Sequence, residues 1–174
     1  MHNSMTKPLS HVDRDACPPL THLDRRGRAR MVDVGAKTPT RRTATVQCWV
    51  RLSPEAFAAL TSAQVKKGDA MTVAQVAGIQ AAKRTDELIP LCHALPLEHV
   101  AVSLIPDEAS RAVRIVCRTA TTAKTGIEME AFVGASVAAL ALYDMVKAVD
   151  PSATITELAL LEKAGGTQPF HRGV

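Results

Sequence analysis

The chain has 174 residues, of which 47% are hydrophobic and 3% aromatic, and its formal net charge is +4. This length is enough for one domain with a proper core and too short for two domains of typical size. The charge excess comes without Lys/Arg blocks or interleaved aromatic residues, so it disfavours a nucleic-acid groove and fits a small polyanion better.

The cysteines and the N-terminal residues indicate where in the cell the protein is expected. Cysteines stand at positions 17, 48, 92 and 117, without a CxxC pair or a short Cys/His spacing. This pattern indicates neither a zinc site nor a disulfide framework. The first residues lack the features of a secretory signal, and we expect no run that approaches the length of a membrane span. These observations predict a cytoplasmic protein with reduced thiols.

The N-terminal part of the chain has little pattern. Residues 1–20 are polar, contain prolines and show no hydrophobic period, so we expect a mobile lead-in before a single domain over residues 21–166. The short apolar patch at 31–34 contains one carboxylate, Asp33. On sequence pattern alone, a turn role is favoured for this residue.

A strand is predicted from Arg41, where Ala44, Val46, Cys48 and Val50 alternate with more polar residues. These four side chains would line one buried face.

Two helices are predicted after this strand. Ser53 can cap a helix that has Pro54 at its first position and runs to about residue 60. Asp69 can cap the next helix, over about residues 70–84. That helix ends in Lys83 and Arg84, whose charges would complement the negative end of the helix dipole.

Residues 88–97 combine leucines with two prolines and His93, which predicts an irregular apolar loop that must be buried against other elements. A histidine in such a loop is more often a satisfied core group than a catalyst, and the pattern alone favours that interpretation. Apolar residues then alternate over 100–104 and, after a turn at 106–107, over 113–117, which predicts a β-hairpin.

The C-terminal third begins with a long helix. Thr125 and Glu128 have the spacing of a capping box, so Glu128 could simply reach back to the Thr125 amide. The helix is predicted to run to about residue 149, where Asp144 and Lys147 share one face and would ordinarily form a surface ion pair. Residues 154–163 alternate as a last strand, and we expect a flexible tail over 167–174.

Helices placed between strands that pair by hairpin as well as by crossover predict an α+β fold of ferredoxin-like type. In this fold an antiparallel sheet is packed with helices on one face.

Seven strings, in order along the chain, carry a resemblance to a known family. They are MVDV (31–34), KGD (67–69), AGIQAAKRT (77–85), LIPLCH (88–93), TGIEMEA (125–131), SVAALALYDMVKAV (136–149) and LLEKAGG (160–166). Together they resemble the molybdenum-cofactor biosynthesis protein C family, MoaC, from about residue 20 to residue 166. Strings of this length are far more specific than any short motif.

The resemblance implies an activity and an assembly. Family members are cyclic pyranopterin monophosphate synthases, lyases that convert (8S)-3',8-cyclo-7,8-dihydroguanosine 5'-triphosphate, a cyclised dihydro-GTP, into cyclic pyranopterin monophosphate and release diphosphate. The reaction is an early step of molybdenum cofactor biosynthesis and is implied to need no metal or organic cofactor. The implied assembly is a homo-oligomer, a hexamer built as a trimer of dimers with active sites at subunit interfaces. Neither nucleic acid nor a membrane is expected as a partner.

The resemblance also implies site residues at the matching positions. The implied catalytic residues are Lys67, His93, Asp144 and Lys147. The implied substrate-binding residues are Asp33, Arg42, Lys83, Leu91, Cys92, His93, Glu128, Met129, Glu130 and Lys163.

These residue types suit the implied chemistry. Rebuilding a purine-derived ring requires several proton transfers, so acids and bases of unlike pKa must face one substrate. We expect Asp144 and Lys147 to exchange protons with the ring system while Lys67 acts on the opposite side. Expelling diphosphate loads negative charge onto the leaving group, and cations can stabilise that charge without a metal. The candidates are Arg42, Lys83, Lys147 and Lys163.

Three positions depart from the family pattern. Ala94 stands where Pro is usual, Ala164 replaces a usual Ser, and Thr167 replaces a usual basic residue. The last two belong to the segment expected to face the phosphates.

Two other classes of function remain open at this point. A non-catalytic oligomer that binds a phosphorylated nucleotide would use the same cations but would not need Asp144 beside two lysines and a histidine. Nucleic-acid binding predicts steep salt dependence and stacking aromatic residues, of which the chain offers one Trp and one Tyr.

Overall fold

The computed structural model describes residues 21–24, 26–62 and 69–173. The chain divides into two units, residues 1–32 and 33–174. In the described part of the first unit, an isolated bridge pairs Leu23 with Ala29, and the Asp24 carboxylate lies 2.8 Å from the Arg28 guanidinium. The described residues of this unit therefore include a small closed turn.

The second unit contains a five-stranded antiparallel sheet. Its strands are β1 (Thr40–Arg51), β2 (His99–Asp107), β3 (Ala112–Ala123), β4 (Thr154–Ala164) and β5 (Phe170–His171), in the spatial order β2-β3-β1-β4-β5. The first four strands have the order and crossovers of a ferredoxin-like fold. The predicted α+β class and the predicted hairpin between β2 and β3 are both confirmed.

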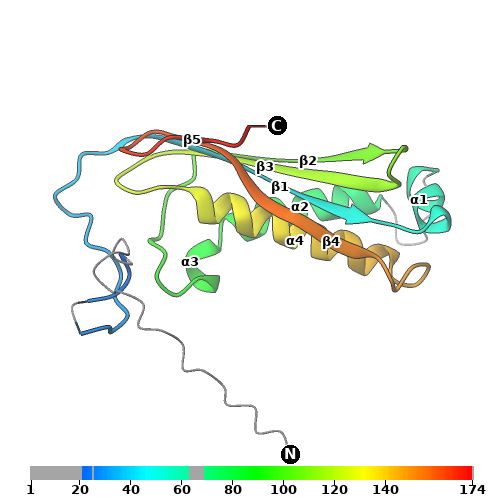
Figure 1. Cartoon of the computed structure of the whole chain (residues 1–174), viewed down its shortest axis with the longest axis horizontal. Helices are drawn as coiled ribbons and strands as arrows, with labels where there is room; N and C mark the ends of the chain where they lie inside the picture. Colours follow the sequence, from blue (N-terminus) through cyan, green and yellow to red (C-terminus); the bar gives the residue numbers. More distant parts are fainter. Residues whose placement is uncertain (1–20, 25, 63–68, 174) are drawn as a thin grey trace, which may run out of the picture. The chain divides into compact units, whose positions relative to one another are not determined.

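The helices of the described residues are α1 (Pro54–Thr61), α2 (Ala70–Ala82), α3 (Thr85–Leu88) and α4 (Glu128–Val146). Of these, α2 and α4 pack directly against one face of the sheet. Figure 1 shows α2 and α4 side by side on the same side of the sheet, with α1 near the end of β1. The expectation of helices on one face is confirmed.

The core lies between the sheet and α4. Ala44, Val46, Cys48 and Val50 are all buried, as the alternation of β1 predicts. The Cys48 thiol donates to the Ala135 carbonyl at 3.6 Å, which marks how closely α4 lies on the strand.

Two glycines permit this close packing. A Cβ atom on Gly78 of α2 would lie 2.7 Å from the Gly134 carbonyl of α4, and a Cβ on Gly134 would lie 2.7 Å from the Cys117 sulfur. Because real Cβ contacts are longer, each helix needs glycine at its crossing point. The glycines thereby fix where α4 runs across the sheet.

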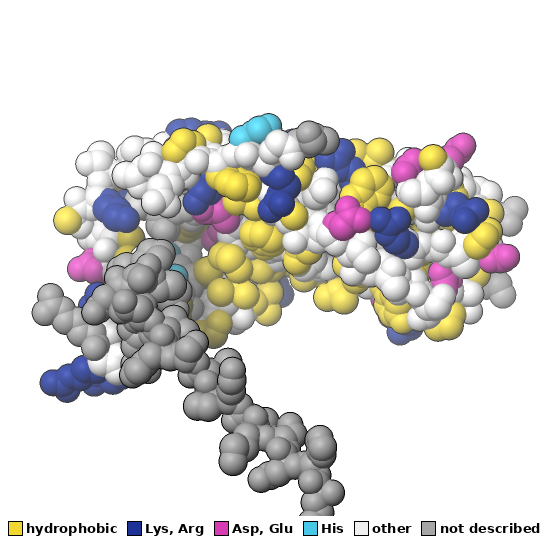
Figure 2. Space-filling view, in the orientation of Figure 1, with side chains coloured by type: hydrophobic (Ala, Val, Ile, Leu, Met, Phe, Trp, Pro, Cys, Tyr) yellow, Lys and Arg dark blue, Asp and Glu magenta, His cyan; other side chains and the backbone are white. Residues whose placement is uncertain are grey.

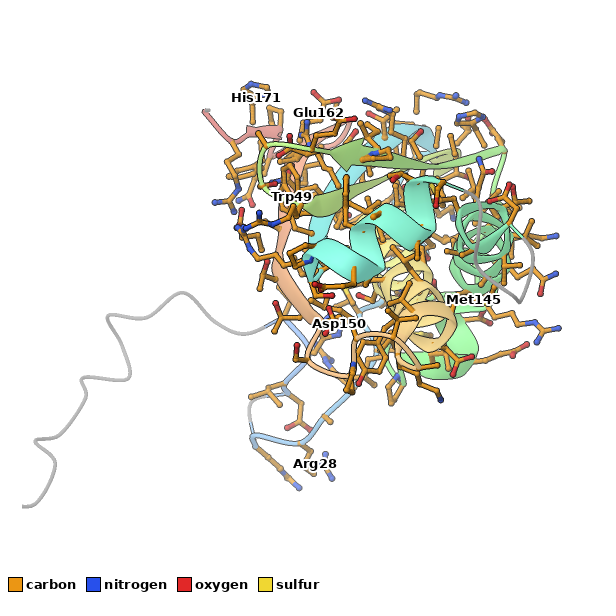
Figure 3. The ribbon with its side chains drawn as sticks, turned by 90° about the vertical axis from the view of Figure 1, so that its right-hand side faces the viewer. Arg28, Trp49, Met145, Asp150, Glu162 and His171 are labelled. Atoms are coloured by element: carbon orange, nitrogen blue, oxygen red, sulfur yellow. The ribbon has the colours of Figure 1, made fainter. Side chains whose placement is uncertain are left out.

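Local capping signals hold for α1 and α2. The Ser53 hydroxyl accepts from the Ala56 amide, and the Asp69 carboxylate accepts from the Met71 and Thr72 amides. Asp150, labelled in Figure 3, adds a long-range tie, because its carboxylate accepts from the Ser53 amide at 2.6 Å. The end of α4 is thus joined to the start of α1.

The capping box predicted at the start of α4 is wrong. The helix begins at Glu128, its N-cap is Ile127, and no side chain caps it. Glu128 instead pairs with Lys163 on β4, so a tertiary partner wins over the local one. The helix also ends at Val146, three residues earlier than predicted, because a turn at 147–149 leads into the Asp150 loop.

The predicted burial of the 88–97 loop is wrong for a single chain. Leu88 is 55% exposed, and residues 89–97 are all half-buried or exposed. Described elements of the same chain cover this loop only in part, since Leu97 packs against the core while Leu88 is exposed, so part of its apolar surface remains available to another molecule.

Two further findings differ from the sequence analysis. The edge strand β5 falls where only a tail was expected, and its residues pair with Glu162 and Lys163. Contrary to the expectation that no run nears a membrane span, α4 is long and apolar enough to cross one by length and composition. However, half of that stretch is buried inside the protein, as in the core helix of many soluble proteins.

Candidate active site

An ion pair stands where α4 meets β4. The Glu128 carboxylate lies 2.9 Å from the Lys163 ammonium, and the two side chains are only 26% and 29% exposed. Glu128 is the first residue of α4, and Lys163 pairs with Ala44 of β1 in the sheet. The two charges largely compensate each other at this point.

Arg42 lies near the ion pair of Glu128 and Lys163. A cavity of about 150 Å³, here the Arg42 cavity, is lined by residues that include Arg42, Gly126, Glu128, Lys163, Gly165 and Thr167. Among the described residues, the Nε atom of Arg42 is buried without a hydrogen-bond partner. A buried guanidinium nitrogen of this kind is costly unless a ligand pairs with it.

The Gly165-Gly166 turn holds Arg42 in place. Both glycines have positive φ, +86° and +74°. A Cβ on Gly165 would overlap the Arg41 carbonyl oxygen, and one on Gly166 would overlap the Arg42 guanidinium. Glycine is therefore required at both positions for the turn to lie directly on Arg42.

A buried carboxyl group belongs to Glu130, two residues after the start of α4. Glu130 is 5% exposed, and burial raises its pKa, with further contributions from the charges of Glu128 and Asp86. Such a group can hold a proton at a pH where an ordinary glutamate has lost it. It is a candidate proton donor at the start of α4.

Cys92 lies near the same carboxylates. Burial raises the pKa of its thiol, and the charges of Glu130 and Asp86 raise it further. Its neighbours Leu91 and His93 are half-buried in the same loop. Met129, next to Glu130, is 37% exposed. The structure thus brings the 91–93 loop to the start of α4.

The Asp33 carboxylate closes a turn. It accepts from the Gly35 amide at 2.8 Å, which confirms the turn role that the sequence pattern favoured. The Lys124 ammonium donates to the Gly35 carbonyl at 2.6 Å. This contact ties the turn of residues 33–37 to the segment just before α4.

Lys83 lies apart from the Arg42 cavity. It caps the end of α2 and lines a separate cavity of about 340 Å³ with Leu97 and His99. The two cavities have no lining residue in common.

Asp144 and Lys147 stand at the other end of α4. Their charged groups are 2.7 Å apart, with side chains 56% and 54% exposed, as the i, i+3 spacing predicts. The hydrogen bond from Lys147 to Asp144 raises the pKa of the lysine, and the aspartate's charge adds to this. Since an α-helix rises 1.5 Å per residue, Asp144 is about 24 Å along α4 from Glu128.

The structure therefore splits the predicted site residues into two groups. Arg42, Glu128, Glu130 and Lys163, with the loop of Cys92, gather at the start of α4, whereas Asp144 and Lys147 are at its end. The predicted catalytic Lys67 lies outside the described residues. No three His, Cys, Asp or Glu side chains converge as metal ligands within residues 21–24, 26–62 and 69–173.

Sequence reasoning missed two cations near the site. Lys37 and Lys124 line a larger cavity next to the Arg42 cavity. Lys124 immediately precedes the string TGIEMEA, so it lay one residue outside the stretch that carried the resemblance. Lys37 stands close after the string MVDV and has no pattern of its own.

Comparison with known proteins gives consistent findings. Residues 31–166 match the family model described as the MoaC family. The cyclic pyranopterin monophosphate synthase of Thermomicrobium roseum is 52% identical over 147 residues, which cover 84% of this chain and 89% of that protein. The synthase of the same name from Roseiflexus castenholzii is 51% identical, covering 84% and 93%.

A human relative is much longer than this chain. Molybdenum cofactor biosynthesis protein 1 of Homo sapiens is 50% identical over 154 residues, which cover 88% of this chain and 24% of that protein. The similarity therefore concerns about a quarter of the human protein.

Proposed function

The chain belongs to the MoaC family, and from this premise we propose that it is a cyclic pyranopterin monophosphate synthase, a lyase of molybdenum cofactor biosynthesis. Its substrate is the cyclised dihydro-GTP, and its products are cyclic pyranopterin monophosphate and diphosphate. The bacterial relatives are named for this activity, and the match with this chain covers most of their length.

The observation that carries this proposal is the Arg42 cavity. Arg42 lines this cavity, and its guanidinium can donate charge-assisted hydrogen bonds to a phosphate there. A bidentate, always-charged guanidinium suits a phosphate better than a mobile ammonium does. Arg42 would hold a phosphate of the substrate and stabilise the charge that develops as diphosphate leaves.

The proton transfers are carried out by acids and bases from both ends of α4. Glu130, with its raised pKa, can donate a proton at the start of α4. Asp144 and Lys147 exchange protons with the ring system, and Lys67 acts from the opposite side. His93 completes the proposed catalytic set, while Asp33, Leu91, Cys92 and Met129 contact the substrate.

A second copy of the chain is part of the proposal. Because about 24 Å of helix separates Glu128 from Asp144, one chain cannot place both on one small substrate. In a closed symmetric assembly, the end of α4 in one copy can meet the start of α4 in another. We propose a homohexamer built as a trimer of dimers, with each site at a subunit interface.

The exposed apolar side chains support this assembly. Val73 and Val76 on α2, Leu140 on α4 and Leu88 in the loop are 45–57% exposed. Figure 2 shows apolar side chains gathered over α4 on the face seen there. Patches of this kind mark protein interfaces, and two copies would cover them. Cytoplasmic location is part of the same proposal and is supported by the free thiols of Cys48, Cys92 and Cys117.

Lys83 is proposed to contact the substrate by a different route. Its cavity is separate from the Arg42 cavity within one chain, so it would reach the substrate only from the loop side or from a neighbouring copy.

The test is turnover. The purified chain is incubated with the cyclised dihydro-GTP, and diphosphate and pterin products are measured together. Equal amounts of the two products are expected, and an Arg42→Ala variant should lose at least about a hundredfold in kcat/KM, in line with loss of a charge-assisted contact to the transition state. Binding of the substrate without release of diphosphate would instead favour the alternative function, a non-catalytic oligomer that binds a phosphorylated nucleotide.

A further inference from the structure

A larger cavity adjoins the Arg42 cavity. It measures about 480 Å³ and is lined by residues that include Lys37, Thr40, Arg42, Lys124, Gly126 and Thr167; we name it the Lys124 cavity. Arg42, Gly126 and Thr167 line both cavities. Arg42 therefore stands at the boundary between two adjoining cavities.

The two cavities differ in charge. In the Arg42 cavity the carboxylate of Glu128 compensates Lys163. The lining of the Lys124 cavity contains three cations and four threonines, and among these lining residues there is no Asp or Glu. Cations and hydroxyl groups without a competing carboxylate form a favourable environment for a polyanion.

Lys124 is held in position. Its ammonium donates to the Gly35 carbonyl at 2.6 Å, and the side chain is half-buried. An ammonium has three N–H donors, so two remain to meet an anion. The same contact fixes the turn that carries Lys37, whose amide donates to the Val34 carbonyl at 3.0 Å. Lys124 thus serves both as a contact and as the anchor of the second cation.

We propose that the Lys124 cavity is a second anion subsite that receives the diphosphate half of a triphosphate substrate, with Lys37 and Lys124 as its contacts. The inference rests on the proposed function for the identity of the substrate. The retained phosphate lies at Arg42, and the two outer phosphates extend toward the lysines.

This placement suits the ring-closing step. A substrate hydroxyl forms a new P–O bond to the innermost phosphorus, the bridging P–O bond to the outer two phosphates breaks, and diphosphate leaves with that bonding pair. The hydroxyl proton passes to a base of the site. Since the negative charge on the bridging oxygen grows as the bond breaks, fixed cations beyond it stabilise the transition state more than the bound substrate.

The subsite is tested by binding of inorganic ions, which needs no turnover. Dissociation constants of inorganic diphosphate and of inorganic monophosphate are measured by calorimetry for the whole chain and for Lys37→Gln and Lys124→Gln. Each variant should bind diphosphate about tenfold more weakly, as expected for loss of one charge-assisted contact, and monophosphate within about twofold of the unchanged chain.

Controls separate local from general effects. Arg51→Gln removes the same charge at the far end of β1 from Arg42 and should leave both constants unchanged. Lys124→Arg keeps the charge and should restore most of the diphosphate affinity, and circular dichroism checks that each variant is folded. Lys37→Gln alters an exposed side chain, so it keeps the test valid if Lys124→Gln fails to fold.

The outcomes are distinct. Unchanged diphosphate affinity in the folded lysine variants, or equal loss for both ions, would overturn the subsite. Selective loss together with no product from the cyclised dihydro-GTP would overturn the proposed function and leave the subsite standing.

Discussion

The carboxylate of Glu128 lies 2.9 Å from the ammonium of Lys163, which joins the first residue of α4 to the end of β4. This pair removes one cation from the Arg42 cavity and leaves Arg42 as the uncompensated charge there. Glu128 therefore sets how strongly the cavity attracts an anion.

Glu128→Gln should strengthen phosphate binding. Loss of the carboxylate frees Lys163 for an anion, so the dissociation constant of inorganic phosphate should fall by roughly fivefold, equivalent to about 1 kcal/mol. Calorimetry at low and at moderate salt measures the effect. Unchanged or weaker binding would mean that the ion pair with Glu128 does not limit how Lys163 binds an anion.

Gly165→Ala should unfold the chain more easily and weaken phosphate binding. The new Cβ would overlap the Arg41 carbonyl at a φ of +86°, so we expect a loss of about 1–3 kcal/mol in the free energy of unfolding. Urea denaturation measures it. Gly173→Ala is the matched control, because a Cβ there meets nothing within 4 Å. If the two variants are equally stable, the turn does not hold Arg42 as described.

Glu130→Gln should change the pH dependence of stability. Because burial raises the pKa of Glu130 in the folded state, the folded protein gains stability from this group below the unfolded-state pKa and loses it as pH rises through the folded-state pKa. The glutamine side chain in this variant carries no charge at any pH. Its Tm relative to the unchanged chain should therefore be higher at pH 8 than at pH 4. A difference that does not vary with pH would show that Glu130 titrates normally.

Asp150→Asn should weaken the link between α4 and α1. The carboxylate accepts from the Ser53 amide and from both the amide and hydroxyl of Ser152. The hydrogen bond from the Ser152 side chain lowers the pKa of Asp150 most, followed by that from the Ser53 amide. We expect a loss of about 1–3 kcal/mol at pH 7.

The Asp150 effect has a defined pH window. A lowered folded-state pKa contributes stability above the unfolded-state value and loses it as pH falls through the folded-state value. The difference between Asp150→Asn and the unchanged chain should thus shrink below about pH 4. Denaturant titrations at pH 7 and pH 3 measure it, and an equal difference at both would contradict the assignment.

Local signals in the sequence predicted most of the fold. The alternation of Ala44, Val46 and Cys48 correctly predicted which side chains of β1 are buried, because one face of this strand packs against the helices. Ser53 and Asp69 cap their helices because a cap depends on residues two or three positions away.

Non-local contacts explain what the sequence missed. Glu128 pairs with a residue 35 positions away, so its capping-box spacing with Thr125 was a false signal. The two residues of β5 are too few to alternate; they are held by pairing with β4, where Figure 3 shows His171 beside Glu162. The 88–97 loop was expected to be buried because its side chains are apolar, but pattern cannot tell burial within one chain from burial between copies.

The candidate site was predicted unevenly. The resemblance supplied Arg42, Glu130 and Lys163, which the fold brings to one end of α4. It also supplied Asp144 and Lys147, and the helix predicted up to about residue 149 already placed these two at the opposite end from Glu128, as the structure has them. The three-dimensional proximity of Lys124 to Gly35, 89 positions apart, likewise leaves no trace in the sequence.

The most direct test of the central claim is complementation between two inactive variants. Arg42→Ala and Asp144→Ala chains carrying different tags are expressed together, and assemblies that contain both are purified and assayed with the cyclised dihydro-GTP. If Arg42 of one copy and Asp144 of another form each site, about a quarter of the sites in a random mixture are intact, and activity returns to about that fraction. Activity no greater than that of the separate variants would contradict a site shared between copies.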